Sequence, residues 1–277
     1  MLRLVGGGEM LVRSIYDFEV FASPRVTPPA HAEADLEPVI RLLAEKRWPF
    51  RFHATYDQTV GRHLDVLERV HRDIPIDDLH WICDHGETLS ERNLERIAAL
   101  GGGLAVQNRI AFQEREFLER YGPAAAADAP PIRKALAMGV PVGAGTDMSR
   151  VSSYNPWLCL QWLVTGQGVG GATLLTDATR LDRMTALRLW TDNAWFTHEQ
   201  ADKGRIAPGM LADLCVLSED YFTVAQERIG TIESVLTVVD GKPVYGGGEF
   251  AGLMSPLPDL KPDWSPVTVY GGFYRAT

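Results

Sequence analysis

Cysteine and long apolar runs are scarce in this sequence, and their scarcity excludes several classes of protein. The 277 residues include three cysteines, and no two of them form a CxxC pair. Neither a disulfide framework nor a cysteine-based zinc site is therefore predicted. We interpret Cys83, Cys159 and Cys215, each in an apolar context, as reduced, buried thiols of a cytoplasmic protein. No segment approaches the ~18 apolar residues of a membrane span. The N-terminal apolar stretch is too short for a signal peptide and ends in glycines.

The sequence also has fewer basic than acidic residues, and it lacks the common nucleotide-binding motifs. The sequence has 27 Lys and Arg against 36 Asp and Glu, so its formal net charge is -9. An acidic surface argues against non-specific binding to nucleic acids or to anionic membranes. The glycine clusters match neither GxxxxGK[ST] nor GxGxxG, and GxSxG does not occur, so a phosphate-binding loop and a serine hydrolase are not predicted.

What the sequence does contain is an alternation of short apolar runs and helical periodicities. At intervals of roughly 25–40 residues, this alternation is typical of βαβ units and a parallel sheet. We expect strands over 2–5, 48–53, 79–83, 104–106 and 140–144, and helices over 34–46, 57–71, 90–100 and 131–138. Residues 157–196 look mainly helical, with a glycine break over 166–171. An Asp240-Gly241 turn between two apolar runs predicts a β-hairpin.

Three of the apolar runs end in a residue that could bind a metal. They are Phe50-Arg-Phe-His53, Trp81-Ile-Cys-Asp-His85 and Val140-Pro-Val-Gly-Ala-Gly-Thr-Asp147. In a (β/α)₈ barrel, residues at the carboxyl ends of the strands point into one shared site. His53, His85 and Asp147 would together form a site for a divalent metal such as zinc.

Each candidate also has a plainer interpretation. His53 could be a hydrogen-bonded core histidine, and Asp147 could cap the following turn. Asp84 and Glu87 could orient His85 or be solvated acids. Glu9, beside three glycines, is equally compatible with a turn. The five remaining histidines look like surface residues: His31, His63, His71, His80 and His198.

Several of these motifs, in this order and spacing, resemble the metal-dependent amidohydrolase superfamily, and most closely its YtcJ-like branch, amidohydrolase family 3. The resemblance extends from about Gly6 to Tyr245. It rests on the segments Arg51–Asp57, Asp84–Glu87, Gly145–Asp147, Ser153–Trp157 and Lys203–Asp213.

The resemblance implies a set of roles. His53 and His85 would be the metal ligands of barrel strands 5 and 6, and Asp147 would be the ligand of strand 8 and the general base. Glu9 would be the bridging carboxylate of strand 4. Further residues follow strands 7 and 8 and could line the substrate pocket or have structural roles: Gln107, Arg109, Arg150, Tyr154, Asn155 and Trp157.

One element of the family pattern is missing, because no HxH motif occurs in the sequence. A complete barrel takes ~250 residues, whereas the strand 8 candidate is at Asp147, which leaves room for about five βα units of ~30 residues. We therefore expect an α/β fold: a partial (β/α)₈ barrel, about strands 4–8, over residues 1–200. A small β-sandwich-like element over 201–250 and an irregular tail over 251–277 would follow. A truncated gene or a split enzyme would account for this.

The expected function is the metal-dependent hydrolysis of amide-like C–N bonds in a small-molecule substrate, by metal-activated water. Without strands 1–3 the chain would be inactive or weakly active alone. The alternative is a non-catalytic barrel fragment, or a subunit that completes its fold as a homo-oligomer or with a missing N-terminal half. The unpaired sheet edges near 2–5 and 140–144 would favour such association. A third option is a site of one metal held by His53, His85 and Asp147 alone.

Overall fold

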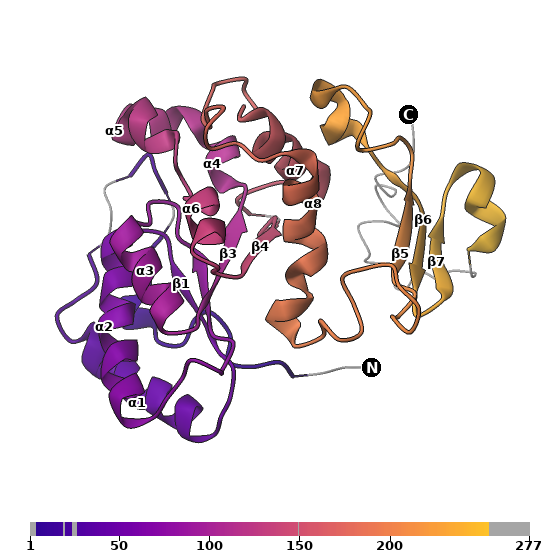
Figure 1. Ribbon diagram of the computed structural model, residues 1–277. Coiled ribbons are helices and arrows are strands. Elements are labelled where there is room, and N and C mark those ends of the chain that lie inside the picture. Colours follow the sequence, from indigo (N-terminus) through magenta and orange to yellow (C-terminus); the bar gives the residue numbers. More distant parts are fainter. Residues whose placement is uncertain (1–3, 19, 24–26, 149, 255–277) are drawn as a thin grey trace, which may run out of the picture. The chain divides into compact units, whose positions relative to one another are not determined.

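A parallel four-stranded sheet lies at the centre of the larger of two structural units, as the computed structural model shows (Figure 1). The structure describes residues 4–18, 20–23, 27–148 and 150–254. The larger unit takes in residues 1–210 and 219–232, and the smaller unit takes in 211–218 and 233–277. Most of the predicted tail, from residue 255 onward, lies outside the described residues.

The parallel sheet has the order β1-β2-β3-β4, which is also the order along the chain. Its strands are short: β1 Arg51–Ala54, β2 Ile82–His85, β3 Gly103–Gln107 and β4 Val142–Gly145. Because consecutive parallel strands are joined by helical crossovers, this order is the one expected from repeated βαβ units. The predicted α/β class with a parallel sheet is confirmed.

The N-terminal segment runs beside β1 as a fifth extended piece of chain. Gly7 forms a parallel bridge with Phe50. The backbone N–H of Arg51 donates to the carbonyl of Gly7 at 3.1 Å, and that of His53 donates to the carbonyl of Glu9 at 3.1 Å. The pairing thus lies further along the chain than the strand predicted over 2–5, of which residues 2 and 3 lie outside the described part.

Helices connect the strands close to where the periodicity places them. They are α1 Ala32–Glu45, α2 Asp57–Asp73, α3 Glu91–Ala99, α4 Arg109–Phe112, α5 Glu114–Ala126, α6 Ile132–Ala137, α7 Pro156–Thr165 and α8 Arg183–Thr191. The short 3₁₀ segments of this unit are η1 Arg13–Ile15, η2 Asp192–Thr197 and η3 Gln226–Thr231. In Figure 1, α1, α2 and α3 lie on the indigo-to-violet side of the unit.

Two features of the helices differ from the prediction. The sequence did not predict α5, because Gly122 and Pro123 interrupt its pattern; Gly122 has φ 79° at a kink within the helix. Residues 157–196 were expected to be mainly helical with a glycine break over 166–171. The break is present but longer than expected, because the chain is not helical between the end of α7 at Thr165 and the start of α8 at Arg183. Gly166, with φ 74°, ends α7, and the side chain of Asp182 caps α8 by accepting from the backbone N–H of Thr185.

The smaller unit contains a three-stranded antiparallel sheet, β5 Leu214–Leu217, β6 Ser234–Val239 and β7 Lys242–Gly246, followed by η4 Gly248–Leu253. Asp240 and Gly241 join β6 to β7 with φ values of 51° and 73°. Positive φ at both residues is the signature of the tight turn that fits a twisted hairpin. The predicted hairpin is confirmed.

The expectation of three buried cysteines is correct for Cys83 and Cys159 but wrong for Cys215, which is exposed. Cys215 lies in β5, where the first three residues are all exposed. Its apolar neighbours indicated burial, but a strand that leaves both faces largely exposed does not bury them.

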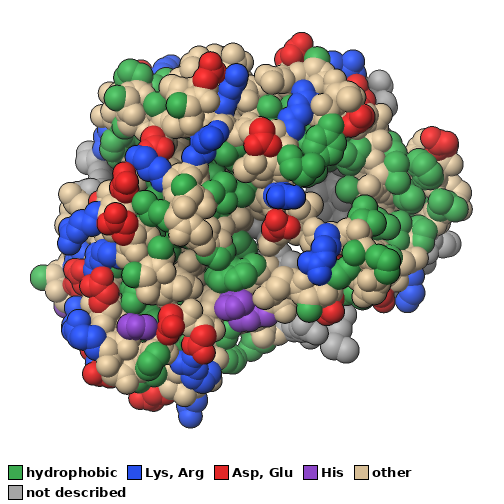
Figure 2. Space-filling model, viewed as in Figure 1, with side chains coloured by type: hydrophobic (Ala, Val, Ile, Leu, Met, Phe, Trp, Pro, Cys, Tyr) green, Lys and Arg blue, Asp and Glu red, His purple; other side chains and the backbone are tan. Residues whose placement is uncertain are grey.

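None of the described helices is long and apolar enough to cross a membrane. Acidic and basic side chains are interspersed over the face seen in Figure 2.

Trp81, just before β2, anchors the packing of the larger unit. It is fully buried, its indole N–H donates to the carbonyl of Leu100 at 2.8 Å, and its ring stacks on Phe52 with centroids 5.8 Å apart. Gly102 faces this ring so closely that a Cβ there would lie 2.3 Å from it. Of the three glycines after α3, Gly102 is therefore the one that the indole requires.

The substitution Gly102→Ala should lower the free energy of unfolding by about 1–3 kcal/mol, because a buried tryptophan held by a hydrogen bond cannot move aside. Urea denaturation would measure the change. Gly145→Ala is the matched control, since nothing lies within 4 Å of a Cβ built at Gly145. Equal effects of the two substitutions would contradict this account of the packing.

His63 was predicted to be a surface residue, and that prediction is wrong. It is 2% exposed on the inner face of α2. Its ring stacks on Phe52 with centroids 4.3 Å apart, and Nδ1 lies 3.0 Å from the carbonyl oxygen of Thr59. Burial disfavours the charged ring and lowers the pKa of His63 to about 4.

This lowered pKa makes stability depend on pH. An unfolded histidine titrates near ~6.5, so between that pH and about 4 the unfolded state binds more protons than the folded state. The free energy of unfolding should therefore fall by roughly 3 kcal/mol through His63 as the pH drops across this window. Denaturation at several pH values should show a shallower dependence for His63→Leu than for the unsubstituted chain. His31→Leu, at an exposed position, is the control for exchanging a histidine for a leucine. An equal change in the two variants would contradict the role given to the burial of His63.

A candidate metal site at the carboxyl ends of the strands

Glu9, His53 and His85 gather at the carboxyl end of the parallel sheet, with one potential ligand atom from each lying within 4.8 Å of the others. Oε2 of Glu9 is 3.8 Å from Nδ1 of His53 and 3.5 Å from Nε2 of His85. The two imidazole centroids are 4.1 Å apart. Both histidines are 2% exposed, whereas the Glu9 side chain is 39% exposed.

The strand register explains how His53 reaches this point. Within β1, Arg51 and His53 share a face because side chains alternate. Asp84, the register partner of His53 on β2, shares that face. Accordingly Nε of Arg51 donates to Oδ2 of Asp84 at 2.6 Å, in a bidentate pair with the fully buried carboxylate. Phe52 and Cys83 face the opposite way, toward the helices.

His85 joins His53 only because the backbone leaves strand geometry at the end of β2. Regular alternation would send its side chain to the face opposite that of Asp84. The φ angle of His85 is 79°, and that of Gly86 is 64°. Positive φ is uncommon for a non-glycine residue and often marks functional sites. Here it turns the imidazole toward His53.

The charges of the cluster stabilise one another. Burial opposes the charged form of His53, but its interactions with Asp17 and Glu9 outweigh burial and raise its pKa to about 10. Burial likewise opposes the charged form of His85, and Glu9 and Glu87 raise its pKa above the usual value. The nearby imidazoles of His53 and His85 outweigh burial and lower the pKa of Glu9 well below its ordinary range. Two imidazoles and a carboxylate are a ligand set for a divalent transition metal, which would displace the ring protons.

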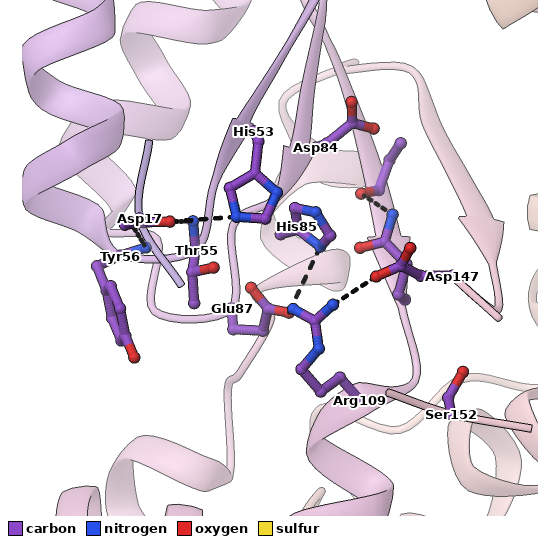
Figure 3. A network of polar contacts seen from close by, with 12 residues as sticks. Asp17, His53, Thr55, Tyr56, Asp84, His85, Glu87, Arg109, Asp147 and Ser152 are labelled. Atoms are coloured by element: carbon purple, nitrogen blue, oxygen red, sulfur yellow. Dashed lines mark hydrogen bonds and ion pairs between the residues drawn. The ribbon is translucent and has the colours of Figure 1, made fainter. Parts of the chain in front are cut away.

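Asp147 lines the same cavity but is not part of this group of three. The cavity, of about 260 Å³, is bounded by Glu9, Tyr16, His53, His85, Asp147, Met148, Arg150 and Val151. The carboxylate of Asp147 accepts a hydrogen bond from Nη2 of Arg109 (Figure 3). Asp147 follows β4 with φ 51°, so its backbone, like that of His85, turns sharply at the end of a strand.

Arg109 holds two acids on opposite sides of its guanidinium. It is fully buried at the start of α4, and Nη1 lies 3.4 Å from Oε1 of Glu87, which is 1% exposed. Burial raises the pKa of Glu87 to about 7. Figure 3 shows Arg109 between Glu87 and Asp147, below the two imidazoles. The sequence indicated that Arg109 could line a pocket or act structurally, and the structure shows an ion pair.

The other predicted pocket residues are more dispersed. Arg150 lines the cavity. Gln107 is 8% exposed and donates to the carbonyl of Ala105 at 3.1 Å, and Tyr154 is 58% exposed. Asn155 caps α7 and donates to the carbonyl of Gly230 at 3.0 Å, so its observed contacts are structural. The ring of Trp157 packs 5.8 Å from that of Tyr221.

Sequence reasoning missed Asp17, a fully buried acid beside His53. Oδ1 of Asp17 lies 3.4 Å from Nε2 of His53. It stands in a segment with no apolar periodicity, and no motif marked it. Its neighbours gave no signal either, because Phe18, directly after it, is 42% exposed.

Comparison with known proteins supports the resemblance found in the sequence. The model for the amidohydrolase family matches residues 1–245. Over 219 residues the chain is 24% identical to YtcJ of Bacillus subtilis (strain 168), which carries an amidohydrolase name; the match covers 78% of this chain and 41% of that protein. The chain thus spans less than half the length of this relative.

Solved structures share the fold. An uncharacterized metal-dependent hydrolase from Pyrococcus horikoshii OT3 matches with a TM-score of 0.59 and 23% identity, over 70% of this chain and 39% of that one. An adenosine deaminase from Xanthomonas campestris with bound zinc matches with a TM-score of 0.53 and 18% identity, over 79% and 50% of the two chains. At these identities the matches show a common fold.

Replacing Arg109 by Met should lower the free energy of unfolding by about 3 kcal/mol. The substitution removes the buried guanidinium and leaves Glu87 and Asp147 without the cation that pairs with them. Arg115→Met is the control: its 78% exposed side chain pairs with Glu116 at 3.6 Å, and the cost should stay within about 1 kcal/mol. Chemical denaturation would measure both. If the two variants lost similar free energies of unfolding, the buried ion pairs of Arg109 would stabilise the fold no more than an exposed one does.

Proposed function

Because the chain belongs to the amidohydrolase family, we propose that it supplies the histidine-and-carboxylate part of a metal centre that hydrolyses amide-like C–N bonds. The observation that carries the proposal is the convergence of Glu9, His53 and His85 within 4.8 Å. The parallel sheet and its N-terminal edge segment would correspond to strands 4–8 of a (β/α)₈ barrel, whose sites lie at the end where these residues meet.

The chemistry of the donor set fits a divalent metal, with zinc as the first candidate. The described residues provide no hydrogen-bond partner for either ring nitrogen of His85, and the nearest carboxylate oxygens lie at 3.5 and 3.9 Å. Buried polar atoms are normally satisfied. Glu9, His53 and His85 would hold the ion. Asp147 lines the same cavity and would complete the ligand set if its carboxylate exchanged Arg109 for the metal.

A divalent metal held there supplies Lewis acidity, which activates water and polarises a carbonyl group. The chain's own contribution is proton transfer and orientation. Asp147 would take a proton from the attacking water and pass it to the departing nitrogen as the C–N bond breaks and the C–O bond forms. Arg109, whose Nη2 donates to this carboxylate, would hold it at the cavity wall until it changes partner. Arg150, at the cavity wall, would face the substrate.

A second candidate is a chain that completes its site with another chain. In the described residues, β4 pairs on one side with β3, and the segment from Gly7 to Glu9 pairs on one side with β1. Strand edges of this kind favour association. A homo-oligomer, or a partner that adds parallel strands and further ligands, would then be the active species, and the chain alone would bind metal weakly or hydrolyse slowly.

Metal content and mass distinguish these possibilities. After incubation with zinc and gel filtration, elemental analysis should find near-stoichiometric zinc in the unsubstituted protein. His53→Ala and His85→Ala should each lose most of it, because a metal site depends on its full ligand count. His80→Ala, outside the cluster, is the control.

Hydrolysis of small amides, measured on the same samples together with the mass in solution, separates an active chain from one that needs a partner. The proposed metal centre would be overturned if the unsubstituted protein held no zinc. It would also be overturned if His53→Ala and His85→Ala each kept their zinc.

A further inference from the structure

We propose that Asp17 positions His53, accepting a hydrogen bond from its Nε2–H so that Nδ1 faces Glu9 and His85 as the metal-binding atom. The inference deepens the proposed function and rests on it, since it assigns which nitrogen binds the metal and which residue determines that choice. Neither the sequence pattern nor the three-residue cluster identifies Asp17.

The imidazole of His53 lies between two acids on opposite sides. Its Nε2 is 3.4 Å from Oδ1 of Asp17, and its Nδ1 is 3.8 Å from Oε2 of Glu9. The Nδ1 side is also the side of His85, whose Nε2 lies 3.5 Å from the same Glu9 oxygen. Figure 3 shows Asp17 approaching His53 from the side of Thr55, away from His85.

The two acids differ in burial, and this difference assigns their roles. The Asp17 side chain is fully buried, whereas that of Glu9 is 39% exposed and lines the cavity. An ionised carboxylate can only accept hydrogen bonds, so the nitrogen that faces Asp17 must carry a hydrogen. In a neutral imidazole the other nitrogen then holds the lone pair. That nitrogen is Nδ1, on the cavity side.

Asp17 is itself held firmly, as a positioning residue must be. The backbone N–H of Thr55 donates to Oδ1 at 2.9 Å, and that of Tyr56 donates to Oδ2 at 3.1 Å. The buried side chain of Ile15 anchors the segment just before it. Tyr16 lies against the imidazole of His53 with ring centroids 4.2 Å apart, so the ring is limited on its face as well as at its edge.

One short segment therefore supplies both a proposed ligand and the group that orients another ligand. Glu9 and Asp17 are eight positions apart, and the carbonyl of Glu9 also accepts from the backbone N–H of His53. Hydrogen-bond acceptors behind metal-binding histidines set the tautomer and raise ligand basicity, and their loss typically costs about 10–100-fold in metal affinity.

A purely structural role is the competing explanation, because Asp17 also ties its own segment to the connection between β1 and α2. Asp57 offers a matched comparison. It too is an acid that accepts from a backbone N–H across the fold, that of Ser90 at 2.7 Å, and from Nδ2 of Asn93 at 2.8 Å. Among the described residues, the hydrogen bonds of Asp57 involve neither histidine. A structural role predicts the same consequences for both acids, whereas positioning predicts a difference.

The experiment compares Asp17→Asn with Asp57→Asn in the full chain. Zinc affinity would be measured by competition with a chelator at fixed pH, below the melting temperatures of both variants, and thermal melting would be recorded in parallel. Both variants should melt earlier than the unsubstituted protein. Only Asp17→Asn should weaken zinc binding, by about 10–100-fold, while Asp57→Asn stays within about twofold of the unsubstituted protein.

A second readout needs no variant. In ¹⁵N NMR of the zinc-loaded, unsubstituted protein, His53 should show a zinc-bound Nδ1 and a protonated Nε2. Coordination through Nε2, or an unchanged zinc affinity in folded Asp17→Asn, would overturn the positioning role while leaving the metal site intact. An unsubstituted protein that binds no zinc would instead overturn the proposed function, and the inference with it.

Discussion

The candidate site depends on one departure from regular strand geometry, the positive φ of 79° at His85. In a parallel sheet the register is fixed by backbone hydrogen bonds, and side chains alternate between the two faces. His53 and Asp84 share the polar face, so the residue after Asp84 belongs by default to the face packed on helices. A turn at this one residue moves the second imidazole across, to 4.1 Å from the first. Without it, each ring would be an isolated buried histidine.

Buried ionisable groups are concentrated around His53 and His85, and apolar packing alone does not explain them. Six of them are no more than 2% exposed: Asp17, His53, Asp84, His85, Glu87 and Arg109. Desolvating so many charges costs more than an apolar core of the same volume. The cost is offset by pairing, as Arg51 holds Asp84 and Arg109 holds Glu87 and Asp147. A core that keeps charges under these conditions is organised for chemistry, which agrees with the perturbed pKa values of its histidines.

The sequence predicted most of the regular elements and the strand-end positions of two histidines that the structure brings together, and the reasons for the successes and the failures are physical. Strand ends and helix stops are local signals, so His53, His85 and the hairpin at Asp240 could be placed from sequence. His63 was misplaced because a histidine suggests a polar face, although its position four residues after Thr59 and beside Leu64 sets it on the buried side of α2. The pairing of Asp147 with Arg109, and the burial of Asp17, are contacts between segments distant in sequence, which no local pattern encodes.

The segment from Gly7 to Asp17 shows why such contacts carry the specificity of the site. Beyond the three-residue turn η1, it has no regular secondary structure of its own. Its backbone is set by bonds to Arg51 and His53 of β1, and its acids meet the side chain of His53 from two directions. The order of this segment and the orientation of the imidazole are therefore mutually dependent. A change at the Asp17 end would reach the metal-facing nitrogen through the ring itself, without altering Glu9 or His85.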